Sequence, residues 1–227
     1  MRASKLHSWN VSTAEAAEIQ RRLSTMVAQT WDGRAVRTIA GADVAFPDKS
    51  TVLAAVVVLT YPGLEVVERS VVEARCRFPY VPGLLAFREA PSLLKALARL
   101  RMGCDLLMCD GQGLAHPRGM GLATHVGILV DEPVIGCAKS VLYGSFTEVP
   151  RARGSYSYMR DRADRTVGAA VRTRDGVRPV YVSVGNRIDL GTAIEIVLAC
   201  SPKYRIPEPL RLAHRLSVGG KESSSDG

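Results

Sequence analysis

The chain of 227 residues is predicted to fold as one α/β domain, in which helices flank a mixed β-sheet made of an antiparallel meander and parallel strands. Two observations predict this class. Three strand-like segments follow one another with only short turns between them, and helical and strand-like segments then alternate. The composition, 47% hydrophobic and 23% charged, is that of a globular protein long enough to bury one sizeable core.

The first part of the chain predicts one helix and the meander. Apolar residues recur at three- and four-residue spacing up to Thr30, behind Ser12 or Thr13 as the N-cap, which indicates an amphipathic helix. β-Branched and alternating residues then predict three antiparallel strands joined by short turns. The expected ranges of these strands are 36–46, 51–61 and 64–75.

The remainder of the chain predicts the alternating part of the domain. Residues 89–102 are expected to form a helix with Pro91 in its first turn, and the apolar run 105–110 a buried strand. The polar stretch 151–164 is expected to be a surface excursion. The other expected elements are a helix at 119–130, strands at 133–138 and 179–184, a helix at 190–200 capped by Asp189, and a short helix at 209–216.

This order of elements resembles that of ribonuclease H-like domains. We expect one such domain over residues 1–217. Residues 218–227 are rich in Gly and Ser and are expected to be a disordered tail.

The charge balance favours a polyanionic partner. Lys and Arg outnumber Asp and Glu by 30 to 22, a formal charge of +8. Basic side chains bind nucleic acid by releasing the cations condensed on its phosphates. A basic surface kept for solubility is an equally good interpretation of the charge alone.

Cysteine usage and hydropathy indicate a cytoplasmic protein. The five cysteines are an odd number without CxxC spacing, and three lie in apolar runs, so reduced buried thiols are expected rather than disulfides or a zinc site. The first ten residues lack the apolar stretch of a secretory signal. No apolar run reaches the roughly 18 to 20 residues of a spanning helix, so no membrane partner is expected.

Three acidic residues stand out by position. Asp43 interrupts an apolar strand, where a charge is costly unless it is paired or binds a metal. Asp110 ends the strand 105–110, at the strand end where sheet proteins place ligand-binding groups. Glu89 begins a predicted helix, where its charge suits the dipole. Taken singly, each also has a structural explanation: a turn cap, the start of a glycine-rich loop, or a favourable helix terminus.

Taken together, the acids predict a site for a hard cation. If adjacent strands bring Asp43 and Asp110 together, two carboxylates about 4 Å apart repel by about 4 kcal/mol at an effective dielectric near 20. Oxygen ligands select Mg²⁺ or Mn²⁺, and no His pair stands at zinc spacing. Such an ion activates water and stabilises a phosphodiester in reaction, so the residues alone predict a Mg²⁺-dependent enzyme acting on a phosphate ester.

Four further features are candidates for substrate contact or proton transfer. His214 has the chemistry to move a proton or orient water, and Lys139 ends an apolar strand facing either a phosphate or the acids. Tyr80, held between prolines, is suited to wedge between bases. The loop 111–121 has four glycines and allows close backbone approach to a ligand. Each also fits a structural role, as a surface histidine, a solvated lysine, a packed turn or an ordinary loop.

Several segments of the sequence resemble the endonuclease V family of ribonuclease H-like nucleases. The matching segments run from about residue 37 to residue 216, which is nearly the whole of the expected folded region. Gln112 departs from the family pattern, which more often has His there. The matching segments are 41–46, 79–91, 110–118, 121–125, 135–140 and 204–214.

The resemblance implies that Asp43, Glu89 and Asp110 hold Mg²⁺, with Mn²⁺ able to substitute, and that His214 assists near the attacking water. It implies that Tyr80 separates strands and that Lys139 contacts the phosphate backbone. A pocket for hypoxanthine, the base of inosine, is implied by analogy. Its expected contacts are Gly83, Leu85, Gly111, Gly113, His116, Gly121 and Leu122.

The implied reaction is hydrolysis of the second phosphodiester on the 3′ side of the deaminated base, leaving 3′-hydroxyl and 5′-phosphate ends, with a role in DNA repair. The resemblance favours a monomer acting on deoxyinosine in DNA, and inosine in RNA stays open as the substrate. Two alternatives also stay open: another ribonuclease H-like nuclease without the base pocket, and a binding module without activity.

Overall fold

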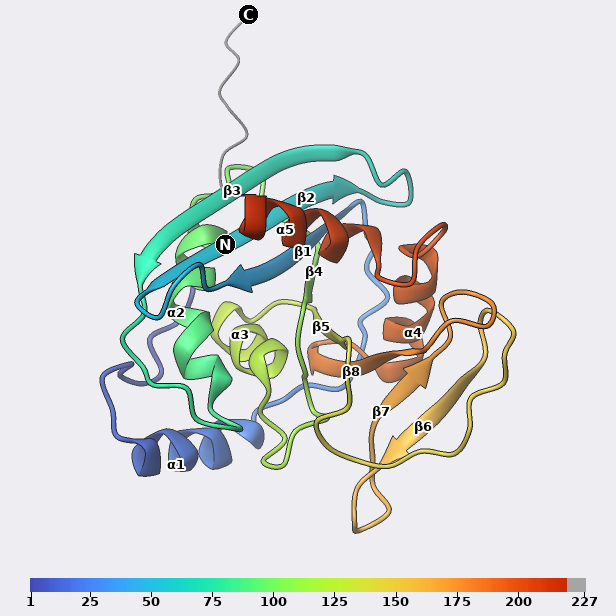
Figure 1. The fold of residues 1–227 in the computed structure, drawn as a ribbon, viewed down its shortest axis with the longest axis horizontal. Helices are drawn as coiled ribbons and strands as arrows, with labels where there is room; N and C mark the ends of the chain where they lie inside the picture. Colours follow the sequence, from blue (N-terminus) through green and yellow to red (C-terminus); the bar gives the residue numbers. More distant parts are fainter. Residues whose placement is uncertain (220–227) are drawn as a thin grey trace, which may run out of the picture.

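The protein, described here by a computed structural model over residues 1–219, is built on one mixed sheet of eight strands (Figure 1). The strand order is β3-β2-β1-β4-β5-β8-β7-β6. The pairs β1–β4 and β4–β5 are parallel, and the other neighbours are antiparallel. The strands are β1 (Thr38–Ala45), β2 (Thr51–Thr60), β3 (Val66–Arg75), β4 (Leu106–Cys109), β5 (Val134–Ala138), β6 (Tyr156–Arg160), β7 (Thr166–Val171) and β8 (Val180–Asn186).

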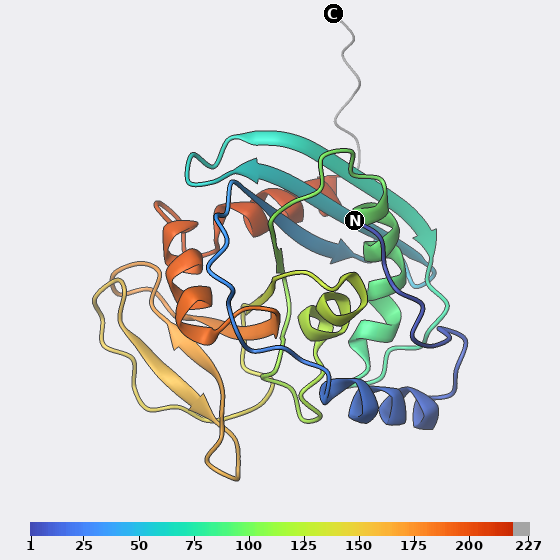
Figure 2. The same ribbon diagram turned by 180° about the vertical axis from the view of Figure 1, so that it is seen from behind.

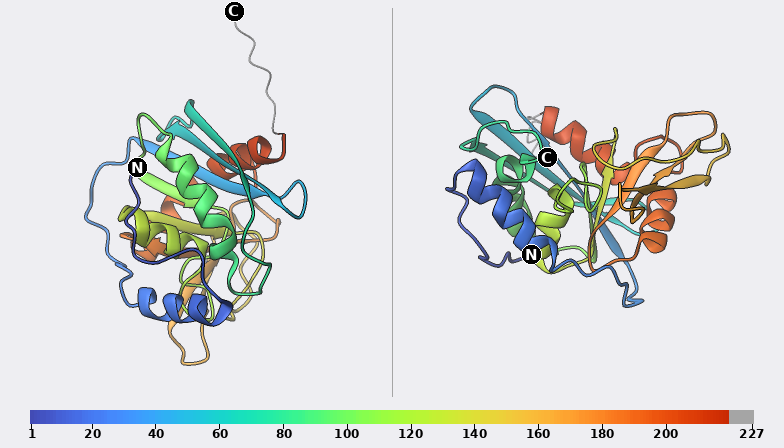
Figure 3. Two further views of the ribbon diagram at one scale, coloured as in Figure 1. Left: turned by 90° about the vertical axis from the view of Figure 1, so that its left-hand side faces the viewer. Right: turned by 90° about the horizontal axis from the view of Figure 1, so that it is seen from below.

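Five helices cover the sheet in the described residues, two on each face and one at the rim (Figures 1 and 2). One core packs α2 and α3 on the sheet, and a second core packs α4 and α5 on the opposite face. Helix α1 packs beside α3 through Leu23, Met120 and Ile128. Figure 3 shows the helices on both sides of the sheet edge-on. The helices are α1 (Thr13–Ser24), α2 (Leu85–Ala98), α3 (Leu122–Val130), α4 (Leu190–Ala199) and α5 (Glu208–Gly219).

The register of the central strands positions the acidic residues. In the parallel pair β1–β4, Ala42 lies opposite Cys109, and the Asp110 amide donates to the Ala42 carbonyl at 2.9 Å. Asp43 follows Ala42 in β1, and Asp110 follows the last residue of β4. The two aspartates therefore lie together at the carboxyl-terminal ends of these strands, which is one edge of the sheet. Helix α5 lies directly on β1 at Gly41. A Cβ at this position would stand 2.1 Å from the Pro209 carbonyl oxygen, so only glycine allows this close approach.

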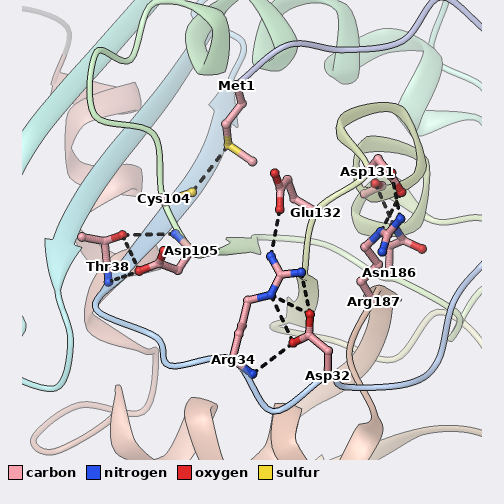
Figure 4. A network of polar contacts seen from close by, with 11 residues as sticks. Met1, Asp32, Arg34, Thr38, Cys104, Asp105, Asp131, Glu132, Asn186 and Arg187 are labelled. Atoms are coloured by element: carbon pink, nitrogen blue, oxygen red, sulfur yellow. Dashed lines mark hydrogen bonds and ion pairs between the residues drawn. The ribbon is translucent and has the colours of Figure 1, made fainter.

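At the opposite edge of the sheet, where β1 and β4 begin, polar side chains have hydrogen-bonding or ion-pair partners (Figure 4). One oxygen of the Asp105 carboxylate accepts from the backbone amides of Arg37 and Thr38, at 2.8 and 2.9 Å, and from the Thr38 hydroxyl at 3.0 Å. Nearby, Arg34 pairs with Asp32 and Arg187 pairs with Asp131. The contacts of Asp105 hold the starts of β1 and β4 together.

The structure confirms the fold class and corrects several boundaries. Helix α1 ends at Ser24 instead of continuing to Thr30, because Val27 and Trp31 leave the helix to pack on the core. Helix α2 begins at Leu85, so Glu89 lies inside the helix and does not start it, and Pro91 is internal. Helix α3 begins at Leu122 after a glycine-rich approach.

The predicted surface excursion 151–164 is wrong in part. Residues 156–160 form β6, and the unpredicted β7 joins it to β8. The segment is polar because β6 is an edge strand with most side chains exposed. Helix α5 runs to Gly219, so Val218 and Gly219 of the predicted tail are helical, and residues 220–227 lie outside the described residues.

The structure agrees with the prediction of buried, reduced cysteines. All five cysteines are free, and Cys109, Cys137 and Cys200 are buried. Among residues 1–219, no helix combines the length and the apolar character that crossing a bilayer requires.

Candidate active site

Two carboxylates and one imidazole converge at the edge of the sheet where β1 and β4 end. One ligand atom from each of Asp43, Asp110 and His214 lies within 4.8 Å of the other two. Asp43 is buried on β1, and Asp110 immediately follows β4. These three residues come from strands and a helix that are packed on each other, so the core fixes their spacing.

Helix α5 supplies two groups to Asp43. The same carboxylate oxygen, Oδ2, lies 3.1 Å from His214 Nδ1 and also accepts a hydrogen bond from the buried Ser217 hydroxyl. His214 and Ser217 are one helical turn apart, which places both side chains on the face of α5 that covers β1. The His214 side chain is 52% exposed, so substrate or water can reach it.

Glu89 lies behind this cluster, on the buried face of α2. Burial, together with the nearby carboxylates of Asp43 and Asp110, raises the pKa of Glu89 to about 8. A carboxyl group with such a pKa is mostly protonated at neutral pH until a cation compensates the charge. Of the three predicted metal-binding acids, Glu89 alone lies outside the tight cluster, where His214 stands instead.

Lys139 neutralises part of the charge on Asp110. It follows β5, the strand beside β4, and its Nζ donates to Asp110 Oδ2. Burial raises the pKa of Asp110 to about 6, with Lys139 opposing the rise and Asp43 adding to it. A single lysine therefore does not compensate the acids of this edge.

The donor set suits a hard divalent cation. Carboxylate oxygens dominate it, and a single imidazole sits at the solvent side. Oxygen-rich sets favour Mg²⁺ and Mn²⁺, whereas structural zinc sites draw on thiolates or several imidazoles. Burial raises the pKa values of Glu89 and Asp110, and the neighbouring carboxylates add to the rise; a bound cation would compensate the buried negative charge.

A cavity of about 380 Å³ opens beside the acids. Asp110 and Lys139 form part of its wall, so the acidic cluster and the cavity share residues. The loop that carries Tyr80 forms a second wall and the loop 111–122 a third. Of the predicted substrate-binding residues, the cavity is lined by Tyr80, Gly83, Leu85, Gly111, His116, Gly121, Leu122 and Lys139.

Tyr80 is the most exposed large apolar side chain in the described residues, at 71%. Its loop is anchored on both sides, because Phe78 and Leu84 are buried in one small cluster with Phe87. An exposed aromatic ring on an anchored loop is free to contact a ligand at the mouth of the cavity.

Gly113 does not line the cavity, unlike the other residues predicted for the pocket. A Cβ on Gly113 would stand 2.1 Å from the Val184 carbonyl oxygen, and its amide donates to the Ser183 hydroxyl at 2.8 Å. Gly113 therefore packs the loop 111–121 against β8, on the side away from the cavity.

His116 is held as a neutral ring. Burial, aided by the charge of Arg118, lowers its pKa to about 4. Its Nδ1 accepts from the Arg118 amide at 3.1 Å, and Nε2 donates to the Gly83 carbonyl at 3.0 Å. The Nδ1 contact thus stays within the loop 111–121, and the Nε2 contact joins this loop to the loop that carries Tyr80.

Two residues of this region escaped the sequence analysis. Ser217 had no signal beyond standing three residues after His214, at the spacing that shares a helix face. Gln20 is a fully buried glutamine in α1 that reaches both walls of the cavity. A glutamine among the apolar positions of an amphipathic helix was a signal that could have found it.

The mixed sheet has the strand order expected of a ribonuclease H-like domain, and the acidic cluster lies at the ends of its strands β1 and β4. The comparisons with known proteins make the assignment narrower. The family model for endonuclease V matches residues 18–215, most of the chain. The chain belongs to the endonuclease V family.

Close relatives span almost its whole length. An endonuclease V from Roseiflexus castenholzii is 51% identical over 221 residues, which cover 97% of this chain and 99% of the relative. The crystal structure of endonuclease V from Streptomyces avermitilis, 41% identical, matches with a TM-score of 0.89 over 97% of each chain.

A third comparison includes a ligand. The Ciona intestinalis endonuclease V, solved in complex with a 24mer DNA containing an inosine followed by a ribo-adenosine, is 26% identical to this chain. It matches with a TM-score of 0.82 over 91% of this chain and 96% of its own.

Proposed function

We propose that this protein is a Mg²⁺-dependent endonuclease that binds a strand at inosine and hydrolyses the second phosphodiester on its 3′ side, leaving 3′-hydroxyl and 5′-phosphate ends. Mn²⁺ substitutes for Mg²⁺, and the cellular role is DNA repair. The observation that carries the proposal is that Asp110 belongs both to the acidic cluster and to the wall of the adjacent cavity. A base bound in the cavity therefore lies next to the groups that would act on its strand.

Asp43, Asp110 and Glu89 would hold the ion. Bound there, Mg²⁺ supplies Lewis-acid activation of water and compensates charge on the reacting phosphate. The chain's own contribution is to position these carboxylates on packed strands and helices, so that little reorganisation accompanies binding. The parts of the site lie on one sheet and on the helices and loops packed against it, which supports the proposal that residues 1–217 act as a single domain.

His214 would orient or deprotonate the attacking water. The tautomer of His214 that donates its Nδ1 proton to Asp43 has a lone pair on Nε2, and the side chain is about half exposed. A lone pair at that position accepts a hydrogen bond from water. The Ser217 hydroxyl on the same Asp43 oxygen fixes the carboxylate against which the imidazole is oriented.

Lys139 would contact the phosphate backbone. It lines the cavity and contacts Asp110, so a phosphate arriving beside Asp110 meets the ammonium group within reach of its flexible stem. The overall charge of +8 favours the approach of the polyanion.

The cavity would receive the hypoxanthine base. Its volume of about 380 Å³ lies within the usual range of small-ligand pockets. The Ciona relative bound to inosine-containing DNA has the same fold and supports this choice of base. Tyr80, exposed at the mouth, would fill the space left in the base stack.

One experiment tests the proposal. An end-labelled strand carrying inosine or adenine at one position is offered as DNA and as RNA, with Mg²⁺ or with EDTA. We expect one cut, at the second phosphodiester 3′ of inosine, only with Mg²⁺. The control is Asp43→Asn, which keeps the shape and removes the charge. Equal cutting at adenine would point instead to a ribonuclease H-like nuclease without base selection, and preferred cutting of the RNA would make RNA the working substrate.

Replacing Tyr80 tests the wedge. Tyr80→Ala should weaken selective binding of inosine-containing duplex by roughly tenfold, since stacking on one base contributes about 1 to 3 kcal/mol. Cutting at saturating substrate should change little. Tyr80→Phe keeps the ring and serves as the control. If the alanine variant prefers inosine over adenine as strongly as the wild type, Tyr80 is not the wedge.

A further inference from the structure

The cavity beside the acids is closed by three chain segments that one side chain ties together. Gln20 lies in α1, more than sixty residues from the loop that carries Tyr80 and about one hundred from the loop 111–121. Its Nε2 donates to the carbonyls of Gly83 and Met120, both at 3.0 Å. Its Oε1 accepts from Arg118 Nε at 2.6 Å. Gln20 thus uses both donor hydrogens and its acceptor on the walls of the cavity.

The carbonyl of Gly83 is the point where these contacts meet. Besides Gln20, it accepts from Arg118 Nη2 at 2.7 Å and from His116 Nε2 at 3.0 Å. Gly83 has φ +78°, and a Cβ there would stand 2.8 Å from the Arg118 guanidinium. Only glycine therefore allows the Tyr80 loop to present this carbonyl so close to the opposite wall.

Burial makes the contacts of Gln20 decisive for the geometry. The side chain is fully buried, so a lost hydrogen bond is not replaced by water. Without Gln20, the Met120 carbonyl and the Arg118 Nε have no other hydrogen-bonding partner in the described residues. Arg118 would then be free to turn away from Gly83, and two of the three contacts on that carbonyl would loosen together.

We propose that Gln20 is a positioning residue that sets the spacing between the Tyr80 loop and the glycine-rich loop, and thereby the base selectivity of the cavity. The inference rests on the function proposed for the cavity. Hypoxanthine and adenine have almost the same shape and differ in the donors and acceptors on one edge. Polar groups reject the wrong edge only when the walls that carry them are held in place.

The test compares variants on the same helix. Gln20→Leu removes all three hydrogen bonds. Gln20→Glu keeps the size and the acceptor for Arg118 but places a carboxylate against two carbonyls. Leu23→Ala is the control, because Leu23 is also buried in α1 and contacts Met120 only through apolar packing. Each protein is assayed below its own unfolding midpoint, with inosine- and adenine-containing strands.

We expect both Gln20 variants to lower the preference for inosine over adenine at least about tenfold, through KM. The value of kcat on saturating inosine substrate should stay within about threefold of the wild type, because the acids are untouched. Amide hydrogen exchange of residues 79–84 should rise in both variants and not in Leu23→Ala.

Two results would overturn the inference: an unchanged preference in both Gln20 variants, or an equal loss in Leu23→Ala, which would assign the effect to the general packing of α1. If Gln20→Leu does not fold, Gln20→Glu alone decides between these outcomes. A wild-type protein with no preference for inosine would instead remove the proposed function. The two failures are therefore distinguishable in one series.

Discussion

An aspartate lies at each end of strand β4, and the surroundings shift the pKa values of the two side chains in opposite directions. Asp105, before the strand, accepts from two backbone amides and the Thr38 hydroxyl. Burial would raise its pKa, but these hydrogen bonds and the charge of Arg37 outweigh it and the pKa is lowered. Burial raises the pKa of Asp110, after the strand, to about 6, and the nearby Asp43 adds to the rise even with Lys139 in contact.

The difference separates an acid that stabilises the fold from one that the fold holds at a cost. Hydrogen bonds to an ionised carboxylate favour its charged form, whereas a second carboxylate disfavours it. A set of acids kept together on a sheet edge, where a few substitutions would relieve the repulsion, indicates a functional role. Position at a strand end alone does not distinguish the two cases, because both aspartates flank the same strand.

The largest expected effect comes from matched alanine variants of these two aspartates. Asp110→Ala should lower the cutting rate by about 10³-fold or more, since metal compensation of transition-state charge contributes several kcal/mol. Its unfolding midpoint without metal should not fall. Asp105→Ala should leave cutting unchanged and lower stability by about 1 to 3 kcal/mol, because two amides lose their acceptor.

The measurements are single-turnover cutting of an inosine strand and thermal unfolding in EDTA. Asp110→Ala should still bind inosine-containing DNA, since the cavity and the overall charge remain. Two results would contradict the contrast between the functional Asp110 and the stabilising Asp105. One is cutting by Asp110→Ala at the wild-type rate, and the other is unfolding of Asp110→Ala at as low a midpoint as that of Asp105→Ala.

The next effect is on the pH dependence of stability. The folded-state pKa of Glu89, about 8, lies above the ordinary value of 4.5, so the folded protein holds a proton that the unfolded chain releases. Below pH 4.5, Glu89 is protonated in both the folded and the unfolded state, so it does not contribute to the pH dependence of stability. As pH rises from there towards 8, the metal-free protein should lose stability, on the order of a few kcal/mol.

Glu89→Gln removes this titration and keeps the shape of the side chain. Unfolding midpoints of the two proteins, measured in EDTA between pH 5 and 8.5, should diverge as pH rises, with the variant the more stable at the alkaline end. Parallel curves would show that Glu89 ionises normally and that the crowding of acids is not energetically significant.

The smallest expected effect concerns Ser217. Ser217→Ala removes one of the two donors to Asp43 and should weaken Mn²⁺ binding by roughly tenfold, the lower range for groups that orient metal ligands. Calorimetric titration without DNA measures this directly. Ser201→Ala is the control, because Ser201 is a buried helix-end serine that donates only to the Val197 carbonyl. Equal Mn²⁺ affinity in all three proteins would leave Ser217 with a purely structural role.

Sequence patterns predicted the order of the core elements because local signals define them. Runs such as residues 52–59 and 106–109 are apolar over their whole length, and Asp189 was correctly predicted as the cap of α4. The strand β6 was missed because an edge strand needs few apolar side chains, and Tyr156–Arg160 has mostly exposed ones. Glu89 was placed at the start of a helix because Pro91 is typical of a first turn, whereas α2 begins at Leu85.

The candidate site likewise contains residues that the sequence could predict and residues that it could not. Asp43 and Asp110 could be paired from the sequence because both interrupt or end apolar strands, and the structure places them in one cluster. The contacts of Gln20 and Ser217 could not be predicted, since they depend on where distant helices land. Gly113 was assigned to the pocket with its neighbours, and only the packing against Val184 shows that it faces the other way.

The contact between α5 and β1 has a consequence for synthesis of the protein. Asp43 is separated from His214 by 171 residues and from Ser217 by 174. A ribosome that has added residue 207 has released all three carboxylates and Lys139, but neither of the α5 groups that contact Asp43. Among the described helices, α5 is made last, so the contacts of His214 and Ser217 with Asp43 form only after the other described elements have been synthesised.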